Sequence, residues 1–422
     1  MSLPLPATAA GPHHVRRDCR ACGGGRLTQF VDLGPQPLAN SLPRSPAEFA
    51  TELFFPMGVY LCEDCGLVQL VDVIDPELLF RDYVYVTGTS DTIAAHNVGY
   101  ARTVVQLLAL TGKDLVVEVA SNDGSLLSRF QTHGVRTLGV EPARNIAAIA
   151  RAAGIETISE FFNEAAGPAI RASHGPAKVV IGNNVLAHVD EPVGFLRGAA
   201  ALLEEDGLVI TEVPYLREFV DRLEYDTVYH EHLCYFSVSA LMRLAERAGL
   251  SIIRVDHVPV HGGSIRMYAA KRARHPQHAP AVQALAAAEL ADGLTTLSRF
   301  QRFATDVSRQ REALRALLTR LKAEGRTVAG YGAPAKGNTQ LNYCGITTDL
   351  MAWTVDKSPH KVGRYIPGTH QPILPAAELL ARQPDYTVIL AWNFAEEIMR
   401  QQAEYHARGG KFILPLPAPV IC

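Results

Sequence analysis

The sequence predicts an α/β protein in three parts, a small cysteine-stapled module followed by two Rossmann-like domains. Two C-x-x-C pairs lie near the N-terminus, and a strand, a tight turn and a helix start are indicated at residues 116–127 and again at residues 326–339. Each of these patterns leads to a second apolar strand ending in an acid, which is the order of a nucleotide-binding βαβ unit. A chain of 422 residues is long enough for two to three domains with separate cores.

The composition indicates a folded protein, because 48% of the residues are hydrophobic and 20% are charged. The net charge of −3 argues against the broad basic field that nucleic-acid binding requires. No apolar run is long enough to span a membrane, and the first residues lack a signal pattern. We expect a cytoplasmic protein, a monomer or weak oligomer, that binds neither nucleic acid nor membranes.

The two C-x-x-C pairs, at residues 19–22 and 62–65, are each followed by glycine, as in a pair of zinc knuckles. Four thiolates would form a closed, structural zinc site, since no position is left for a catalytic water. A disulfide pair or two unrelated pairs are the alternatives, and a cytosolic chain favours zinc over both. The predicted ligands are Cys19, Cys22, Cys62 and Cys65.

The loop at residues 116–127 has the features of a cofactor site. Gly124 and the small Ala120 allow a close backbone approach, and the strand that follows ends in Glu141, about 20 residues on, where a ribose-binding acid is expected. The loop lacks the three spaced glycines of a pyrophosphate cradle. S-adenosylmethionine fits better, because its sulfonium and amine suit a loop that carries Glu118 and Asp123. A βαβ turn without a ligand is the alternative.

Two further strands, at residues 178–189 and 207–214, continue the βαβ pattern. Ligands of open α/β sheets bind at the carboxyl ends of the strands, so Asn183, Asn184, His188 and Glu212 are expected at the pocket. His188 could equally begin a helix without a chemical role.

The densest group of reactive side chains lies at residues 225–237, where His230 and His232 flank Glu231. Their spacing does not match the helical H-E-x-x-H of zinc proteases, so a general base is the better interpretation. A solvated polar turn is the alternative. Upstream, residues 80–90 are rich in aromatic and hydroxyl side chains and could either cover a pocket or simply pack as a tyrosine pair.

Apolar residues at helical spacing predict a long helical connector before the second Rossmann-like pattern. That pattern carries G-x-G-x-x-A at residues 330–335, and Lys336 adds a positive charge at a helix N-terminus, which suits a diphosphate. We therefore expect a nucleotide-linked substrate there. The rival interpretation is a nicotinamide site with Asp356 on the ribose.

With the cysteine knuckles, VEVASNDGSLL, NNVLAHV, YHEH followed by YF, and GYGAPAKGN in this order, the chain resembles the deoxysugar C-methyltransferases. It is most similar to those acting at C-3 (C-3′) of dTDP-4-keto-2,6-dideoxyhexoses in antibiotic biosynthesis, and the resemblance runs from about Cys19 to the C-terminus. It implies an active site between an S-adenosylmethionine-dependent methyltransferase domain and a dTDP-sugar domain. The expected parts are a disordered tail (1–15), a zinc-binding module (16–75), the methyltransferase domain (76–272), the helical connector (273–325) and the nucleotide-sugar domain (326–422).

The resemblance also implies roles for residues. The ketone at C-4 acidifies the hydrogen on C-3, so His232 would remove it as the base, Glu231 would orient the imidazole, and Tyr229, Tyr85 or His188 would donate to the enolate oxygen. The expected cofactor residues are Glu118, Ala120, Asn122, Asp123, Glu141, Asn183 and Asn184. The expected substrate residues are Tyr331, Ala333, Lys336, Asn338, Arg364 and Tyr365.

Two other hypotheses stay open from the sequence. An NAD(P)-dependent nucleotide-sugar oxidoreductase would use the second Rossmann-like domain for catalysis. A scaffold stapled by zinc would bind neither cofactor and would tolerate substitution of His232.

Overall fold

The computed structural model describes residues 12–81, 91–259 and 262–422. The first described strand is β1 (His13–Val15), which pairs antiparallel with β5 (Asp72–Ile74). His13 and Asp72 fix this pair through a 2.8 Å contact between Nε2 and Oδ1. The expectation that the disordered tail extends to residue 15 is therefore wrong for residues 13–15, because they form a strand of the zinc-binding module.

The zinc-binding module is built on a four-stranded antiparallel sheet of order β11-β4-β3-β2. Its strands are β2 (Leu27–Pro37), β3 (Phe54–Cys62), β4 (Val68–Leu70) and β11 (Cys234–Tyr235), and the short helices η1 (Pro46–Thr51) and α1 (Pro76–Phe80) flank it. The fourth strand, β11, comes from the middle of the chain. The segment with the two histidines thus leads directly into this sheet.

The central domain contains a seven-stranded sheet of order β12-β13-β10-β9-β6-β7-β8. Its strands are β6 (Leu115–Val119), β7 (Arg136–Val140), β8 (Thr157–Ile158), β9 (Ala177–Asn183), β10 (Leu203–Pro214), β12 (Leu250–Val258) and β13 (Ser264–Lys271). β13 lies antiparallel to both neighbours, β10 and β12, while β8, β7, β6, β9 and β10 form a parallel series. This is the predicted Rossmann-like fold with an antiparallel strand added.

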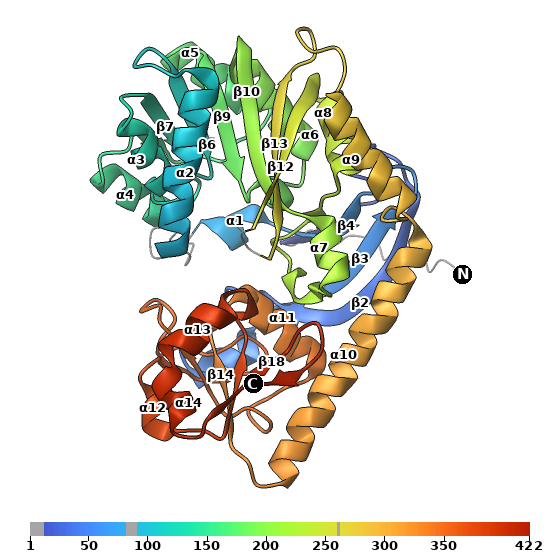
Figure 1. Ribbon diagram of the computed structural model, residues 1–422, viewed down its shortest axis with the longest axis vertical. Coiled ribbons are helices and arrows are strands. Elements are labelled where there is room, and N and C mark those ends of the chain that lie inside the picture. The colour runs from blue at the N-terminus through green and yellow to red at the C-terminus, as the bar shows by residue number, and fades with distance from the viewer. Residues whose placement is uncertain (1–11, 82–90, 260–261) are drawn as a thin grey trace.

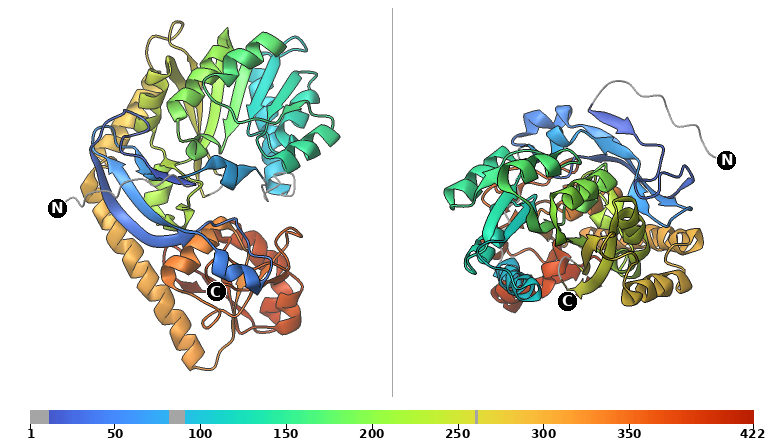
Figure 2. Two further views of the ribbon diagram at one scale, coloured as in Figure 1. Left: turned by 180° about the vertical axis from the view of Figure 1, so that it is seen from behind. Right: turned by 90° about the horizontal axis from the view of Figure 1, so that it is seen from above.

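Helices cover both faces of the central sheet (Figures 1 and 2). Successive residues of a strand point to opposite faces, so Val116 packs into one hydrophobic cluster and Val117 into the other. The helices of this domain are α2 (Asp91–Leu108), α3 (Ser125–Gln131), α4 (Arg144–Ala152), α5 (Ala166–His174), η3 (Leu186–His188), α6 (Pro192–Leu202), α7 (Leu216–Asp221), η4 (Tyr225–Thr227) and α8 (Val238–Arg247).

The C-terminal domain has a six-stranded sheet of order β16-β15-β14-β17-β18-β19, parallel except for β19. Its strands are β14 (Val328–Tyr331), β15 (Thr354–Asp356), β16 (Ile373–Pro375), β17 (Tyr386–Ile389), β18 (Lys411–Leu414) and β19 (Val420–Ile421). Its helices are α11 (Ala335–Cys344), α12 (Glu378–Arg382), η5 (Trp392–Phe394), α13 (Ala395–Gln401) and α14 (Ala403–Ala407). The strand, turn and helix expected at residues 326–339 are β14 and the start of α11.

The expected helical connector consists of α9 (Pro280–Ala291) and α10 (Leu297–Ala323). α10 runs along one side of the molecule, from the central domain to the C-terminal domain (Figure 1). Its first half buries Phe300 and Phe303 in the core shared with the zinc-binding module, and its second half buries Leu314 and Leu318 in the C-terminal core. The predicted helical connector is present, and its apolar stripe packs the domains together.

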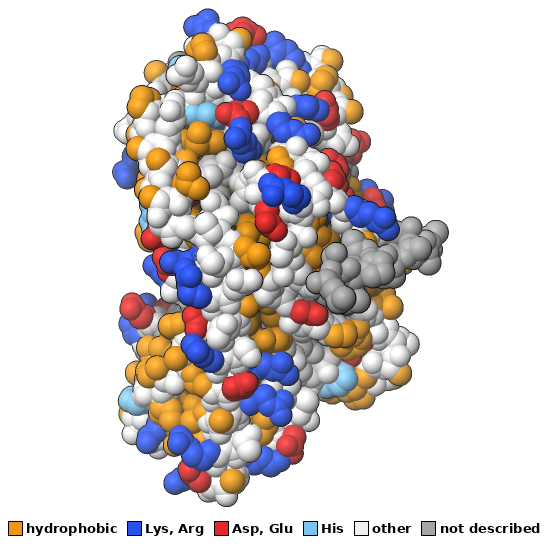
Figure 3. Space-filling view, turned by 90° about the vertical axis from the view of Figure 1, so that its right-hand side faces the viewer, with side chains coloured by type: hydrophobic (Ala, Val, Ile, Leu, Met, Phe, Trp, Pro, Cys, Tyr) orange, Lys and Arg blue, Asp and Glu red, His pale blue; other side chains and the backbone are white. Residues whose placement is uncertain are grey.

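The face that carries α9 and α10 shows basic and acidic side chains interspersed (Figure 3). A mixed surface of this kind lacks the single-sign field typical of nucleic-acid binding. In the described part of the chain, none of the helices is both apolar and long enough to cross a membrane.

Candidate active site

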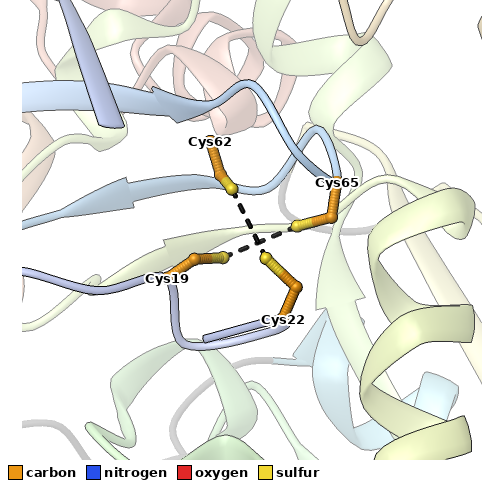
Figure 4. A group of neighbouring side chains, drawn as sticks. All are labelled: Cys19, Cys22, Cys62 and Cys65. Atoms are coloured by element: carbon orange, nitrogen blue, oxygen red, sulfur yellow. Dashed lines mark hydrogen bonds between the residues drawn. The ribbon is translucent and has the colours of Figure 1, made fainter. Parts of the chain in front are cut away.

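The four predicted zinc ligands meet at one point of the N-terminal module (Figure 4). The Sγ atoms of Cys19, Cys22, Cys62 and Cys65 all lie within 4.8 Å of one another. Tetrahedral zinc with four thiolates holds its sulfur atoms about 3.8 Å apart, so this donor set fits structural zinc without a large rearrangement.

The two knuckles have the same backbone geometry. Gly23 donates to the carbonyl of Cys19 and Gly66 to the carbonyl of Cys62, each at 2.8 Å, with φ of +77° and +76°. Glycine adopts this left-handed conformation without strain, which explains the glycine after each pair. Backbone N–H groups also donate to two of the sulfur atoms, as expected for thiolates.

The predicted cofactor residues gather at the carboxyl edge of the central sheet. β6 lies between β7 and β9, so the ends of these three strands bring Glu118, Glu141 and Asn183 to one edge. The turn after β6 has positive φ at Ala120 (+55°) and Asn122 (+50°), so these two backbone units curve sharply before α3. Such a cradle fits an adenosine-containing cofactor that is held by strand ends and acids.

The acids of this cradle are unusual because they are buried together. Burial, with the charges of Asp123 and Glu141 next, raises the pKa of Glu118 well above its usual value, and one of its carboxyl oxygens is buried without a hydrogen-bond partner in the described structure. Burial also raises the pKa of Glu141, whose two oxygens accept from the backbone N–H groups of Asn122 (2.9 Å) and Ala143 (2.8 Å). A cationic cofactor would compensate this concentration of acid.

Asn183 is the last residue of β9, and Asn184 follows it at the same edge. The side-chain oxygen of Asn183 accepts from the hydroxyl of Tyr100 at 3.2 Å. Asn184 has φ of +51°, and its N–H donates to the carbonyl of Glu212 at 2.7 Å. The segment after β9 is thereby tied to the end of β10.

His232 is held by both of its ring nitrogens. Nδ1 lies 2.8 Å from the carbonyl oxygen of Thr227, so it carries the proton and donates to that carbonyl. Nε2 lies 2.7 Å from the hydroxyl of Tyr229 and is therefore the acceptor. The lone pair on Nε2 is what a general base requires.

The prediction that Glu231 orients the imidazole of His232 is wrong. Both ring nitrogens are engaged by Thr227 and Tyr229, and Glu231 points instead to the zinc-binding module, where Oε1 accepts from Nδ2 of Asn40 at 2.6 Å. Successive residues in an irregular turn project in different directions, which separates these two side chains.

His188 lies against His232. Their ring centroids are 4.8 Å apart at 81°, and Phe80 lies 5.7 Å from His188 on the other side. Burial lowers the pKa of His188 to about 4, and its Nδ1 is buried without a hydrogen-bond partner in the described structure. The imidazole is therefore neutral near pH 7. Tyr85, the remaining predicted catalytic residue, lies outside the described residues.

Among the predicted substrate residues, Lys336 has the most exceptional environment. Its Nζ lies 4.5 Å from the ring centroid of Trp392 and is buried without a hydrogen-bond partner in the described structure. The indole N–H of Trp392 donates to Asp226 of η4 at 2.6 Å. The start of α11 therefore faces the central domain.

The other predicted substrate residues have structural contacts. Tyr331 is buried in the C-terminal core, Ala333 donates its N–H to Asp356 at 2.7 Å, and Asn338 donates through Nδ2 to the carbonyl of Pro367 at 2.8 Å. Arg364 is half-buried, and Tyr365 packs edge-on against Phe49 of the zinc-binding module at 5.2 Å. Asp356, proposed for a ribose in the oxidoreductase hypothesis, accepts from two backbone N–H groups, those of Ala333 and Ser358.

The sequence did not indicate Asn40, Thr227 or Trp392. Thr227 acts through its carbonyl, for which a sequence carries no signal. Asn40 lies in a turn-rich stretch far from Glu231 in the chain, and Trp392 follows β17 at the carboxyl edge of the second sheet. Only the last position could have been found, since strand ends of an α/β sheet are where ligand residues are expected.

Three family models match successive parts of the chain. They are described as a zinc binding domain (residues 19–80), a methyltransferase domain (95–255) and a C-methyltransferase C-terminal domain (259–417). Their order is the order of the three parts described above.

A curated relative covers almost the whole chain. C-methyltransferase NovU from Streptomyces niveus is 38% identical over 402 residues, which is 95% of this chain and 96% of NovU. Solved structures similar to the chain include magnesium protoporphyrin IX methyltransferase (ChlM) from Synechocystis PCC 6803 with bound SAM (16% identity, 43% of this chain and 82% of that one, TM-score 0.33). The CcbJ methyltransferase from Streptomyces caelestis is another (14% identity, 42% of this chain and 89% of that one, TM-score 0.33).

The cysteine cluster, the acid-lined cradle and a full-length relative agree on the cofactors, S-adenosylmethionine and structural zinc. The chain belongs to the deoxysugar C-methyltransferase family that its motifs indicate, and it is an S-adenosylmethionine-dependent C-methyltransferase.

Proposed function

We propose that the protein methylates C-3 of a dTDP-linked 4-keto-(2,6-di)deoxyhexose, in deoxysugar biosynthesis in the cytoplasm, through an enolate formed by His232. The observation that carries the proposal is the tautomer of His232. Its Nδ1–H donates to the carbonyl of Thr227, so Nε2 carries no proton and directs its lone pair to the hydroxyl of Tyr229.

An imidazole in this state can take a proton from a carbon next to a ketone. The C–H bond at C-3 breaks, its electron pair becomes the enolate, and the proton moves to Nε2 of His232. The imidazolium that results keeps its Nδ1–H bond to Thr227, which stabilises the charged form. After the methyl group is transferred, the ketone is restored and His232 returns the proton to solvent.

The enolate oxygen needs a donor, and two described groups suit that role. The hydroxyl of Tyr229 lies 2.7 Å from Nε2, so a substrate that displaces this hydrogen bond would receive one from the tyrosine beside the base. His188 is neutral and 4.8 Å from the imidazole of His232, ring to ring. Neutral donors suit this role because they can hydrogen-bond to the enolate oxygen without transferring their own proton to it.

S-adenosylmethionine supplies the electrophilic methyl group when it is bound, and the residues that would hold it are those at the edge of β6, β7 and β9. Glu118 and Glu141 would face its charged and hydroxyl groups, with Ala120, Asn122, Asp123, Asn183 and Asn184 lining the cradle. Binding a cation there would favour the ionised form of Glu118, whose pKa is raised by burial.

The substrate diphosphate would bind at the start of α11. Support comes from the buried Nζ of Lys336, a cation without a hydrogen-bond partner in the described structure that faces the central domain beside Trp392. A bound diphosphate would provide the missing acceptors. Ala333 and Asn338 would then shape this turn through their backbone, and Arg364, Tyr331 and Tyr365 would have secondary roles.

The test is His232→Asn with the dTDP-4-keto sugar in heavy water. We expect S-adenosylhomocysteine affinity to stay within about twofold, while exchange of the C-3 hydrogen falls by at least about 10²-fold. His133→Asn, at an exposed turn, is the matched control and should exchange normally. Normal exchange in His232→Asn would remove His232 as the base.

A further inference from the structure

We propose that Arg20, inside the first zinc knuckle, is a positioning residue for the pair His188 and His232. This inference rests on the proposed function of the two histidines. The side chain of Arg20 is fully buried, although it belongs to a cysteine knuckle at the edge of the molecule's N-terminal module. A buried guanidinium is costly unless several acceptors compensate it, so its contacts indicate its role.

Arg20 joins two segments that come from different domains. Nε donates to Oδ1 of Asp190 at 3.0 Å, and Nη2 lies 2.9 Å from the same oxygen. Nη1 donates to the carbonyl of Leu70 at the end of β4. The backbone N–H of Arg20 donates to the side chain of Gln69 at 3.0 Å, which fixes the knuckle to β4 as well.

These contacts belong to a closed series of hydrogen bonds and short backbone segments that runs from Arg20 through Leu70, Leu233, Ala187 and Asp190 back to Arg20, which we call the circuit. The N–H of Leu70 donates to the carbonyl of Leu233 (3.0 Å), and the N–H of Leu233 donates to the carbonyl of Ala187 (2.7 Å). From Ala187 the backbone runs through His188 to Asp190, whose carboxylate accepts from Arg20 and so closes the circuit. His188 is thus inside the circuit, and His232 immediately precedes one of its members.

The circuit sets the distance between the two imidazole rings, whose centroids are 4.8 Å apart. His188 follows Ala187 and His232 precedes Leu233, so each imidazole belongs to a residue next to the backbone hydrogen bond between Leu233 and Ala187. A shift of either segment therefore moves one ring relative to the other. A displacement of about 1 Å in a catalytic group can cost about 10²-fold in rate. Arg20 suits this task because its planar fork reaches two acceptors at once, whereas lysine provides a single charged point.

The experiment compares Arg20→Gln, Arg20→Lys and Asp190→Asn with the control Arg247→Gln. Arg247 also bridges the domains, since its Nη1 donates to the carbonyl of Ala21 in the same knuckle at 2.9 Å, but it lies outside the circuit. Arg16 donates to the backbone carbonyl of Asp190 at 2.7 Å, a contact whose two groups none of the substitutions removes, so we expect the two segments to stay attached. Zinc content, thermal unfolding and S-adenosylhomocysteine affinity are measured for each protein.

We expect Arg20→Gln to keep stoichiometric zinc and S-adenosylhomocysteine affinity within about twofold, while kcat falls by about 10- to 100-fold at little change in KM. Arg20→Lys should retain an intermediate rate, Asp190→Asn should resemble Arg20→Gln, and Arg247→Gln should keep the wild-type kcat. In spectra of protein labelled with ¹⁵N-histidine, the imidazole signals of His188 and His232 should move in Arg20→Gln and stay in Arg247→Gln.

Wild-type kcat and unchanged imidazole signals in zinc-loaded Arg20→Gln would overturn the inference. If Arg20→Gln loses zinc, Asp190→Asn decides the question, because Asp190 lies outside the knuckle. Equal losses in Asp190→Asn and Arg247→Gln would mean that any weakened docking of the module lowers the rate, and that too would overturn it. If the wild-type protein does not process the keto sugar, the proposed function fails, and the imidazole signals still report whether Arg20 positions the rings.

Discussion

The hydroxyl of Tyr229 and the carbonyl of Thr227 together fix the tautomer of His232. If Tyr229 also donates to the enolate oxygen, Tyr229→Phe removes that donor and keeps the ring that packs 4.0 Å from the imidazole. We expect kcat to fall by about 10²- to 10³-fold with S-adenosylhomocysteine affinity unchanged. Steady-state kinetics and calorimetry measure the two effects. Tyr386→Phe, in the C-terminal sheet, is the control, and a wild-type kcat in Tyr229→Phe would assign the donor role to His188 or another group.

His230 is a histidine whose titration affects stability, since it is 2% exposed and its Nε2 lies 3.2 Å from the carbonyl of Pro56. Burial lowers the pKa of His230 to about 4. The unfolded chain takes up a proton below about pH 6.5, whereas the folded protein stays neutral there, so stability is lost as the pH falls from about 6.5 to about 4. His230→Gln removes this dependence and keeps a donor for the carbonyl.

Urea unfolding at about pH 7.5 and about pH 5.5 tests this linkage. Between these two values the wild-type protein should lose about 1 kcal/mol more stability than His230→Gln, by the proton linkage of one such group. His188, whose pKa is also lowered to about 4, is present in both proteins and cancels in the comparison. Equal losses in the two proteins would show that His230 is already hydrated in the folded state.

At the residue scale, the sequence could indicate which residues belong to the candidate site, but not the direction in which each side chain points. The residues around 225–237 indicated a general base, the family resemblance implied His232 for that role, and the role stays a prediction. The role of Glu231 was inferred from adjacency and is wrong, because its partner among the described residues is Asn40, which is 191 positions away in the chain. Hydrogen bonds of this range depend on how the module docks, and single-sequence patterns report only local periodicity.

Among the elements, β11 connects the zinc-binding module to the candidate active site. It pairs with β4 through Cys234 and Tyr235, directly after His232. Zinc fixes the knuckle that precedes β4, so removing the metal should loosen this pairing as well as the module. We expect chelation to lower the thermal midpoint and to increase amide exchange at residues 230–235 and 68–70, while the cradle at β6 keeps its protection.

Hydrogen exchange followed by mass spectrometry measures this, with and without a zinc chelator. Protein reloaded with zinc is the control and should regain the protection at both segments. If the chelated protein exchanges faster only around the four cysteines, the metal stabilises its knuckles alone and β11 is held by other contacts.

The regular elements were predictable where apolar periodicity is long. β6, β7, β9 and β10 bury continuous apolar runs, and α10 repeats its apolar positions over 27 residues. β11 has only two residues and therefore no apolar periodicity, so the sequence could not predict that it joins the sheet of the zinc-binding module. The same applies to β1, which was assigned to a tail because three residues carry no pattern.

On the scale of the whole molecule, η4 is one of the places where the central and C-terminal domains meet. The hydroxyl of Tyr225 donates to Gln310 of α10 at 2.6 Å, and Asp226 accepts from Trp392 of the C-terminal domain. Thr339 of α11 donates to the carbonyl of Val228 at 2.8 Å, next to Tyr229. The domain expected to hold the nucleotide therefore supports the backbone that presents Tyr229 to His232.

Thr339→Val tests whether this contact matters for catalysis. The substitution keeps the shape of the side chain and leaves the buried carbonyl of Val228 without its donor, which should cost about 1–3 kcal/mol of stability. We expect kcat to fall several-fold while S-adenosylhomocysteine affinity stays constant, because the cofactor cradle lies on other strands. Thr305→Val, on the exposed face of α10, is the matched control and should change neither quantity. A Thr339→Val protein with lower stability and a wild-type kcat would mean that the C-terminal domain only docks at η4, and that Tyr229 is positioned by the central domain and the zinc-binding module alone.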